Sequence, residues 1–87
     1  MRNILYIEEM FMTTLKDINV GSSVLVKKVR GDGPTIRRIM DMGLTKGTKV
    51  YVRKFAPLGD PIQLNLRGFE LTIRKDDAKN IEVEEIR

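Results

Sequence analysis

The side chains that perform most enzyme chemistry are missing from this chain. Its 87 residues include no cysteine and no histidine. A cysteine nucleophile, a disulfide and a thiolate metal site are therefore excluded, together with the commonest general base and the commonest transition-metal ligand. Ser22 and Ser23 have no histidine to activate them. We therefore expect a protein that is not an enzyme, holds no cofactor and works in a reducing, intracellular compartment.

Carboxylates and glycines are the remaining groups that could hold a metal ion or a phosphate. The candidate oxygen donors are scattered along the chain, for example at Asp32, Asp41, Asp60, Asp76 and Asp77. A selective transition-metal site would prefer some imidazole, and adjacent aspartates are typical of the first turn of a helix. The segment Gly31–Gly33 lacks the third glycine of a dinucleotide-binding loop, and no Gly-Lys-Ser/Thr sequence follows it. We predict neither a metal site nor a nucleotide site.

The charge of the chain points to binding rather than catalysis. The net charge is +4, but residues 12–75 carry 13 basic and 5 acidic side chains, whereas residues 76–87 carry 5 acidic and 2 basic ones. A basic body with an acidic tail could contact an acidic protein face, a phosphate or an anionic membrane. A basic surface without a dedicated partner is the alternative.

The segment from Gly31 to Gly47 predicts one short helix between glycine-containing turns. Pro34 suits the first position of a helix, where its missing N–H would have no partner, and Gly43 can take the left-handed conformation that ends a helix. Helical spacing predicts a core face with Ile36, Ile39 and Met40 and an outward face with Arg37, Arg38 and Met42. An exposed methionine beside two arginines would suit a protein partner. Leu44, directly after Gly43, can pack back on the last turn.

The loop Ala56–Pro61 predicts a second rigid element. Its two prolines restrict the backbone, Gly59 permits a positive φ, and the Asp60 carboxylate can bond its own turn. Leu58 would then lie exposed at the tip as an apolar anchor for a partner.

The rest of the chain alternates as short strands, at Ser22–Arg30, Thr48–Phe55, Ile62–Leu66, Phe69–Arg74 and Ile81–Ile86. A change of parity predicts a bulge near Lys27 and Lys28, and Arg67-Gly68 predicts a two-residue hairpin turn. Single helical turns are expected at Thr13–Asp17 and 76–80. About five strands with one apolar face predict a mainly β fold, a small barrel, with the helix covering one end.

Residues 1–11 are expected to be an N-terminal extension outside the domain, which would occupy residues 12–87. The apolar run Ile4–Ile7 is too short to span a bilayer or to form the core of a signal peptide. A short helix that uses Ile4, Ile7 and Phe11 is the competing interpretation.

The chain resembles the FeoA family, ferrous iron transport protein A, from Thr14 to about Val83. The matching segments are Leu15-Lys16-Asp17 before Gly21, the helix from Gly33-Pro34 to Met42-Gly43-Leu44, the loop Ala56–Pro61, and the hairpin Arg67-Gly68-Phe69-Glu70-Leu71. The resemblance implies an SH3-like barrel with an inserted helix, located in the cytoplasm, that assists the membrane transporter FeoB by protein contact. The residues expected at the partner surface are Arg37, Arg38, Met42, Leu44, Leu58 and Asp60.

Two other functions remain open for such a barrel. Tyr51, Arg53 and Phe55 would form a basic and aromatic stripe on one strand, which is typical of nucleic-acid-binding barrels. A metal-responsive iron chaperone or regulatory domain is the other possibility, since the same fold ends many iron-dependent repressors. A weak homo-oligomer through exposed strand edges is a further alternative.

Overall fold

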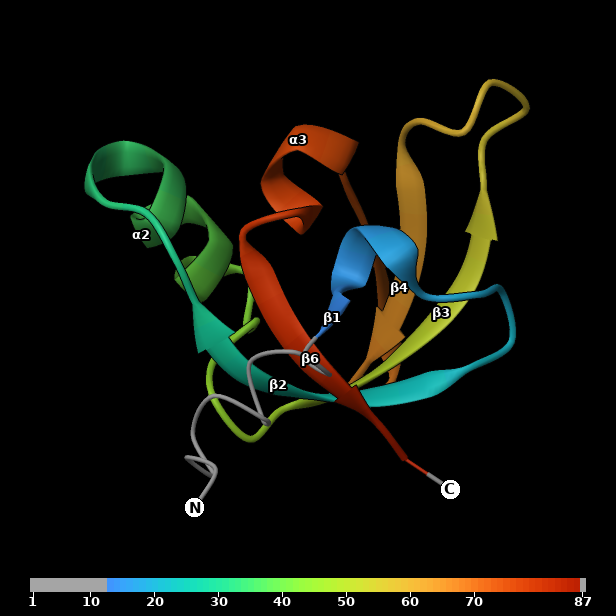
Figure 1. The fold of residues 1–87 in the computed structure, drawn as a ribbon, viewed down its shortest axis with the longest axis horizontal. Helices are drawn as coiled ribbons and strands as arrows, with labels where there is room; N and C mark the ends of the chain where they lie inside the picture. Colours follow the sequence, from blue (N-terminus) through green and yellow to red (C-terminus); the bar gives the residue numbers. More distant parts are fainter. Residues whose placement is uncertain (1–12, 87) are drawn as a thin grey trace, which may run out of the picture.

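A computed structural model describes residues 13–86 of the chain. Within this range one antiparallel sheet has the strand order β1-β6-β2-β3-β4-β5 (Figure 1). The strands are β1 Thr13–Thr14, β2 Ser23–Val29, β3 Lys49–Phe55, β4 Ile62–Leu66, β5 Phe69–Ile73 and β6 Ile81–Glu85. The helices are the 3₁₀ turn η1 Leu15–Asp17, the α-helix α2 Gly33–Asp41 and the short α3 Lys75–Ala78.

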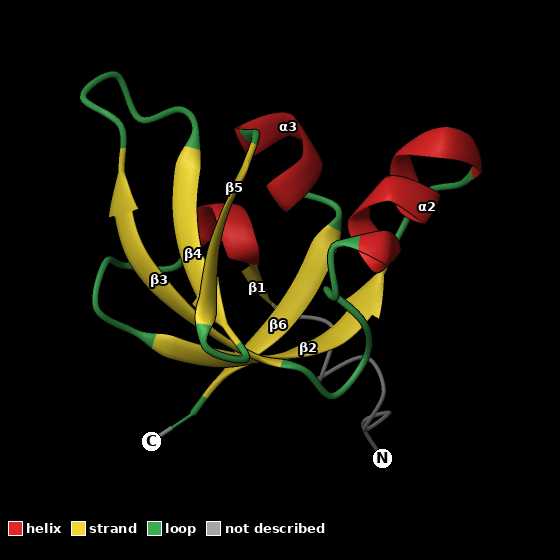
Figure 2. Ribbon diagram, turned by 180° about the vertical axis from the view of Figure 1, so that it is seen from behind, coloured by secondary structure: helices red, strands yellow, loops and turns green. Residues whose placement is uncertain are grey.

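The sheet curls around a single apolar core and leaves one end open, where η1 and α3 lie (Figure 1). Helix α2 lies beside α3, past the end of β2. From behind, β5 runs from the β4–β5 hairpin toward α3 (Figure 2). Because β1 and β5 end the strand order, the barrel is not closed by pairing between them. The buried apolar residues are Leu15, Ile18, Val24, Val26, Ile39, Leu44, Val50, Val52, Ile62, Leu64, Leu66, Ile73, Ala78, Ile81 and Val83.

The five expected strands are confirmed, and so is the bulge in the first of them. The register of β2 on β6 shifts between Val26 and Lys28, so the side chains after the bulge change face. Arg67 and Gly68 both have a positive φ, 52° and 85°, as a two-residue hairpin turn of the mirror-image type requires.

Strand β1 is the element that the sequence did not indicate. Its two residues pair with β6, Thr13 opposite Val83 and Thr14 opposite Glu82. A strand of two residues is too short to show an alternating pattern, so this segment was expected to be a helical turn. The turn itself forms, but only as η1, directly after the strand.

Between residues 13 and 86, no helix combines the length and the apolar character needed to cross a bilayer. The expected N-terminal extension, residues 1–11, lies outside the described residues.

Candidate functional site

Helix α2 ends as its sequence predicts and begins one residue earlier, at Gly33. Pro34 is its second residue, and Gly43 follows its C-cap with φ +97°. The N–H of Gly43 donates to the Met40 carbonyl at 2.9 Å, and the N–H of Leu44 donates to the Ile39 carbonyl at 3.3 Å. This pair of bonds is a Schellman motif, which turns the chain sharply and sends Leu44 into the core.

The buried face of α2 is not quite the predicted one. Ile39 is fully buried and Ile36 is half-buried, but Met40, predicted to be core, is 48% exposed. Met42, predicted to face outward, packs partly buried against the core. The buried stripe therefore runs through Ile36, Ile39 and Met42, three residues apart. The burial of Leu44 fixes the last turn of the helix in this orientation.

Leu44 was expected at the partner surface, and this expectation is wrong. Its side chain is fully buried in the core. The Schellman turn at Gly43 points Leu44 inward, and the hydroxyl of Thr48 closes the same turn by donating to the Gly43 carbonyl at 3.0 Å. Leu44 positions the helix and cannot itself contact a partner.

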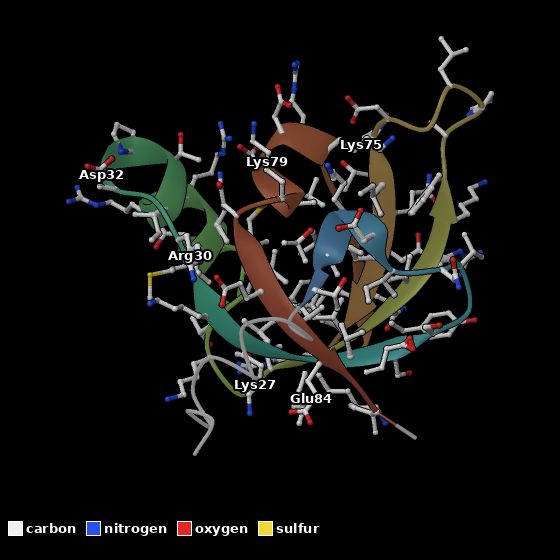
Figure 3. All side chains as sticks on the ribbon, in the orientation of Figure 1. Lys27, Arg30, Asp32, Lys75, Lys79 and Glu84 are labelled. Carbon is white, nitrogen blue, oxygen red and sulfur yellow. The ribbon has the colours of Figure 1, made fainter. Side chains whose placement is uncertain are left out.

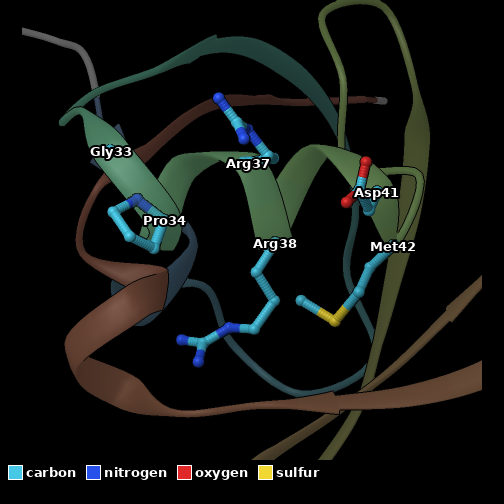
Figure 4. Close-up of a pocket in the computed structure, with 6 residues that line it drawn as sticks. All are labelled: Gly33, Pro34, Arg37, Arg38, Asp41 and Met42. Atoms are coloured by element: carbon cyan, nitrogen blue, oxygen red, sulfur yellow. The ribbon is translucent and has the colours of Figure 1, made fainter.

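An open hollow of about 460 Å³ lies along α2 (Figure 4). Its lining residues are Gly33, Pro34, Arg37, Arg38, Asp41 and Met42. Figure 4 shows the side chains of Arg38 and Met42 extending from the same side of the helix, whereas Arg37 extends from the other. The hollow thus combines apolar surface from Pro34 and Met42 with two arginine residues, Arg37 and Arg38.

An ion pair joins this helix to α3. Nη2 of Arg38 lies 2.6 Å from Oδ2 of Asp77, and the side chains are 60% and 15% exposed respectively. The two residues are 39 positions apart in the chain. Nothing in the sequence pattern paired them, because the contact exists only once the sheet has brought α3 beside α2.

Leu58 lies where it was expected. It is 95% exposed at the tip of the β3–β4 loop, and the turn is closed by the Gly59 N–H, which donates to the Ala56 carbonyl at 2.7 Å. This loop and α2 are at opposite sides of the molecule, with α3 between them (Figure 1). The structure therefore does not bring Leu58 together with Arg37 and Arg38.

Asp60 has a structural contact that differs from the predicted one. Its Oδ1 accepts a hydrogen bond from the backbone N–H of Lys75 at 3.0 Å, at the start of α3, rather than from its own turn. The β4–β5 hairpin places Ile73 opposite Ile62, so the end of β5 lies beside the β3–β4 loop. The hairpin register thus brings this carboxylate to the first turn of α3.

The acidic tail is not a separate charged region. Strand β6 lies beside β2, where Glu84 pairs with Lys27 at 3.3 Å and Glu82 pairs with Arg30. Figure 3 shows Lys27 and Glu84 together on one side of the sheet and Arg30 at the end of β2. The tail therefore pairs with two basic side chains of the body, and no ion pair between described residues involves Arg37.

The aromatic and basic stripe expected on β3 is interrupted. Phe55 packs against the core, and Nη1 of Arg53 lies 2.8 Å from Oε2 of Glu70. Tyr51, which is 43% exposed, is therefore the exposed aromatic side chain of the stripe. This arrangement is poorer for stacking bases than the sequence indicated. Among residues 13–86, no three His, Cys, Asp or Glu side chains gather where they could hold a metal ion.

Comparison with known proteins gives consistent matches. The model of the FeoA domain matches residues 13–85. The chain is 33% identical over 70 residues to the Fe(2+) transport protein A/Fe(2+) transporter FeoB fusion protein of Porphyromonas gingivalis, covering 80% of this chain but only 8% of that protein.

Solved structures agree with this assignment. A FeoA-like protein from Clostridium acetobutylicum is 41% identical, with a TM-score of 0.81 over 87% of this chain and 88% of that chain. FeoA from Stenotrophomonas maltophilia, described as an SH3 domain protein, is 22% identical and shares the fold, with a TM-score of 0.68 over 83% and 89% of the two chains. The mainly β, SH3-like architecture is thus confirmed, and the chain belongs to the FeoA domain family.

Proposed function

We propose that this chain is a cytoplasmic accessory protein of ferrous-iron uptake, which binds the cytoplasmic part of a FeoB-type transporter and catalyses no reaction itself. The observation that carries the proposal is the Porphyromonas gingivalis relative, in which a transport protein A part is joined to FeoB on one polypeptide. Covalent joining raises the effective concentration of two parts for each other. It therefore supports a physical association when the two parts are separate chains.

The α2 hollow is the surface that we propose for this contact. Arginine and methionine are enriched at protein interfaces, and the hollow presents both beside the ring of Pro34. Leu58 offers a second, separate contact at the far side of the molecule. Asp60 supports that loop through its bond to Lys75.

The proposal is tested by direct binding. The purified protein is titrated against its cognate transporter in lipid nanodiscs, without nucleotide, with GDP and with a non-hydrolysable GTP analogue. We expect binding in at least one of these states, with a Kd of about micromolar order because the contact surface is small. Absence of binding in all three states would contradict the proposal.

A charge reversal on α2 locates the contact. Arg37→Glu should weaken binding about tenfold, since Arg37 is exposed and lines the hollow. Lys54→Glu, an equal charge change on an exposed residue of β3, is the control and should have a much smaller effect. Met42→Glu is less informative, because Met42 packs against the core and its replacement would also disturb the fold. Equal effects of the two charge reversals would place the contact elsewhere.

A further inference from the structure

Arg38 has two possible partners in this fold. Its guanidinium is bonded to Asp77, yet its side chain is 60% exposed and lines the open hollow next to Met42. Asp77 is much less accessible, at 15%. A ligand in the hollow would therefore approach the guanidinium from its exposed side and compete there with the less accessible Asp77.

The shape and charge of the hollow define the ligand that would fit. Pro34 and Met42 offer apolar surface, and the lining includes two arginines against one aspartate, Asp41. A guanidinium binds carboxylates through two parallel hydrogen bonds. The matching ligand is a peptide segment with a carboxylate next to an apolar side chain, which would satisfy the Arg38 guanidinium and cover Met42.

The Arg38–Asp77 pair competes with such a ligand. A ligand carboxylate that binds both terminal nitrogens of the Arg38 guanidinium shares Nη2 with Asp77, and so competes with the bond to Asp77. Helix α2 is otherwise held at its C-terminal end, through Ile39, Met42 and the turn at Gly43, whereas its first residues, 33–35, are exposed. The ion pair thus restrains the helix at Arg38. A ligand in the hollow would bind at this same residue.

We propose that the α2 hollow binds an acidic, apolar-containing segment of the transporter, and that Asp77 is an internal competitor which the partner's carboxylate displaces from Arg38. This inference rests on the proposed function for the identity of the partner. The chemistry of the hollow is tested separately from it.

The first experiment uses model peptides and backbone amide NMR. An eight-residue peptide of alternating Glu and Leu is titrated into the intact protein, and a peptide with Lys in place of Glu is titrated in parallel. We expect the Glu peptide to shift the amide signals of residues 35–42 and of Asp77, and the Lys peptide to leave them unchanged. No shifts with the Glu peptide, or equal shifts with both peptides, would overturn the inference.

Two aspartate variants then isolate the competition. Asp77→Asn should bind the Glu peptide about two- to fivefold more tightly, the factor that corresponds to one partly exposed ion pair. Asp76→Asn makes the same change in net charge one residue away, on a side chain that is 93% exposed and lies 4.0 Å from Lys79. It should leave the affinity nearly unchanged. Equal gains in both variants would show that only net charge matters and would reject the competition.

Two arginine variants test the role of the Arg38 guanidinium in the same way. Arg38→Gln should lower the affinity for the Glu peptide at least about fivefold. Arg53→Gln removes an arginine of similar exposure, 54%, that is paired with Glu70 on β3, and it should have little effect. Equal losses in the two variants would overturn the role of Arg38.

The same variants, measured against the transporter, separate the two proposals. Transporter binding that Asp77→Asn strengthens and Arg38→Gln weakens supports both. Transporter binding that neither variant changes leaves the accessory function standing and rejects the competition at Arg38. Absence of transporter binding, with the expected pattern for the Glu peptide, rejects the transporter as the partner and supports an acidic ligand from another protein.

Discussion

At the residue scale, two leucines in this chain have opposite roles. Leu44 is fully buried behind the turn that ends α2, whereas Leu58 is 95% exposed at the tip of a rigid loop. Burial of a leucine side chain contributes about 1.5–3 kcal/mol to folding, and an exposed leucine contributes almost nothing. The first leucine therefore stabilises the helix position, and the second is available for contact.

The observed buried face of α2 predicts that two side-chain truncations change the free energy of unfolding by different amounts. Leu44→Ala should lower the free energy of unfolding by about 2–5 kcal/mol, because it leaves a cavity in the core. Met40→Ala should change it by less than about 0.5 kcal/mol, because Met40 is 48% exposed. Urea unfolding followed by circular dichroism measures both. A large loss for Met40→Ala would restore the originally predicted core face.

Leu58 predicts the reverse pattern, with binding affected and stability unchanged. Leu58→Ser should leave the free energy of unfolding within about 0.5 kcal/mol of its original value and should weaken transporter binding severalfold. Val20→Ser, on a side chain that is 54% exposed, is the matched control and should change neither. Full binding by Leu58→Ser would show that the loop tip has only a structural role.

At the element scale, α2 depends on its ends. A helix of nine residues is too short to be stable by itself in water, so its contacts with the domain must hold it in place. These contacts are the Schellman turn at Gly43, the packing of Ile39 and Met42, and the ion pair from Arg38 to Asp77. Each of them lies in the C-terminal half of the helix or in the turn that follows it.

A substitution at Gly43 should therefore weaken the whole helix. Gly43→Ala is expected to lower the free energy of unfolding by about 1–2 kcal/mol, because alanine is strained at φ +97°. Its Cβ would also lie 3.4 Å from Cδ1 of Leu66. Gly43→Asn should lose less, since asparagine tolerates the left-handed region better. Urea unfolding and hydrogen exchange at the Leu44 amide measure the change; equal stability of all three proteins would contradict this role of the turn.

At the scale of the whole molecule, the sheet places acidic and basic side chains next to each other. Strand β6 places Glu84 beside Lys27 and Glu82 beside Arg30, so two acidic side chains of the tail lie against basic side chains of the body. The α2 region keeps exposed arginine charge, because Arg37 forms no ion pair with any described residue. Such exposed charge steers association and is screened by salt.

Transporter binding should accordingly depend on salt through the association rate. Between about 0.1 M and about 1 M salt the Debye length falls from about 10 Å to about 3 Å, so the association rate constant should fall about tenfold. The dissociation rate should change less, because close contacts are screened less. Surface-immobilised transporter and a flow measurement of both rates test this; a salt-independent association rate would exclude electrostatic steering.

The sequence by itself determined the local features of this protein. The strand ranges, the bulge near Lys27, the Arg67-Gly68 turn and the end of α2 at Gly43 all follow from residues that are neighbours in the chain. Turn chemistry and alternation act over a few residues, and their signals can be read without the fold. The family resemblance rests on the same local segments, and the matched range of residues 13–85 confirms it.

Only the tertiary structure decided which distant groups meet. Asp77 reaches Arg38 and Asp60 reaches the Lys75 N–H because the curled sheet places α3 between α2 and the β3–β4 loop. Helical spacing allowed either Met40 or Met42 to be buried, and packing against the core selected Met42. Ion pairs and core contacts between distant residues depend on how whole elements are arranged, and no pattern along the chain records that arrangement.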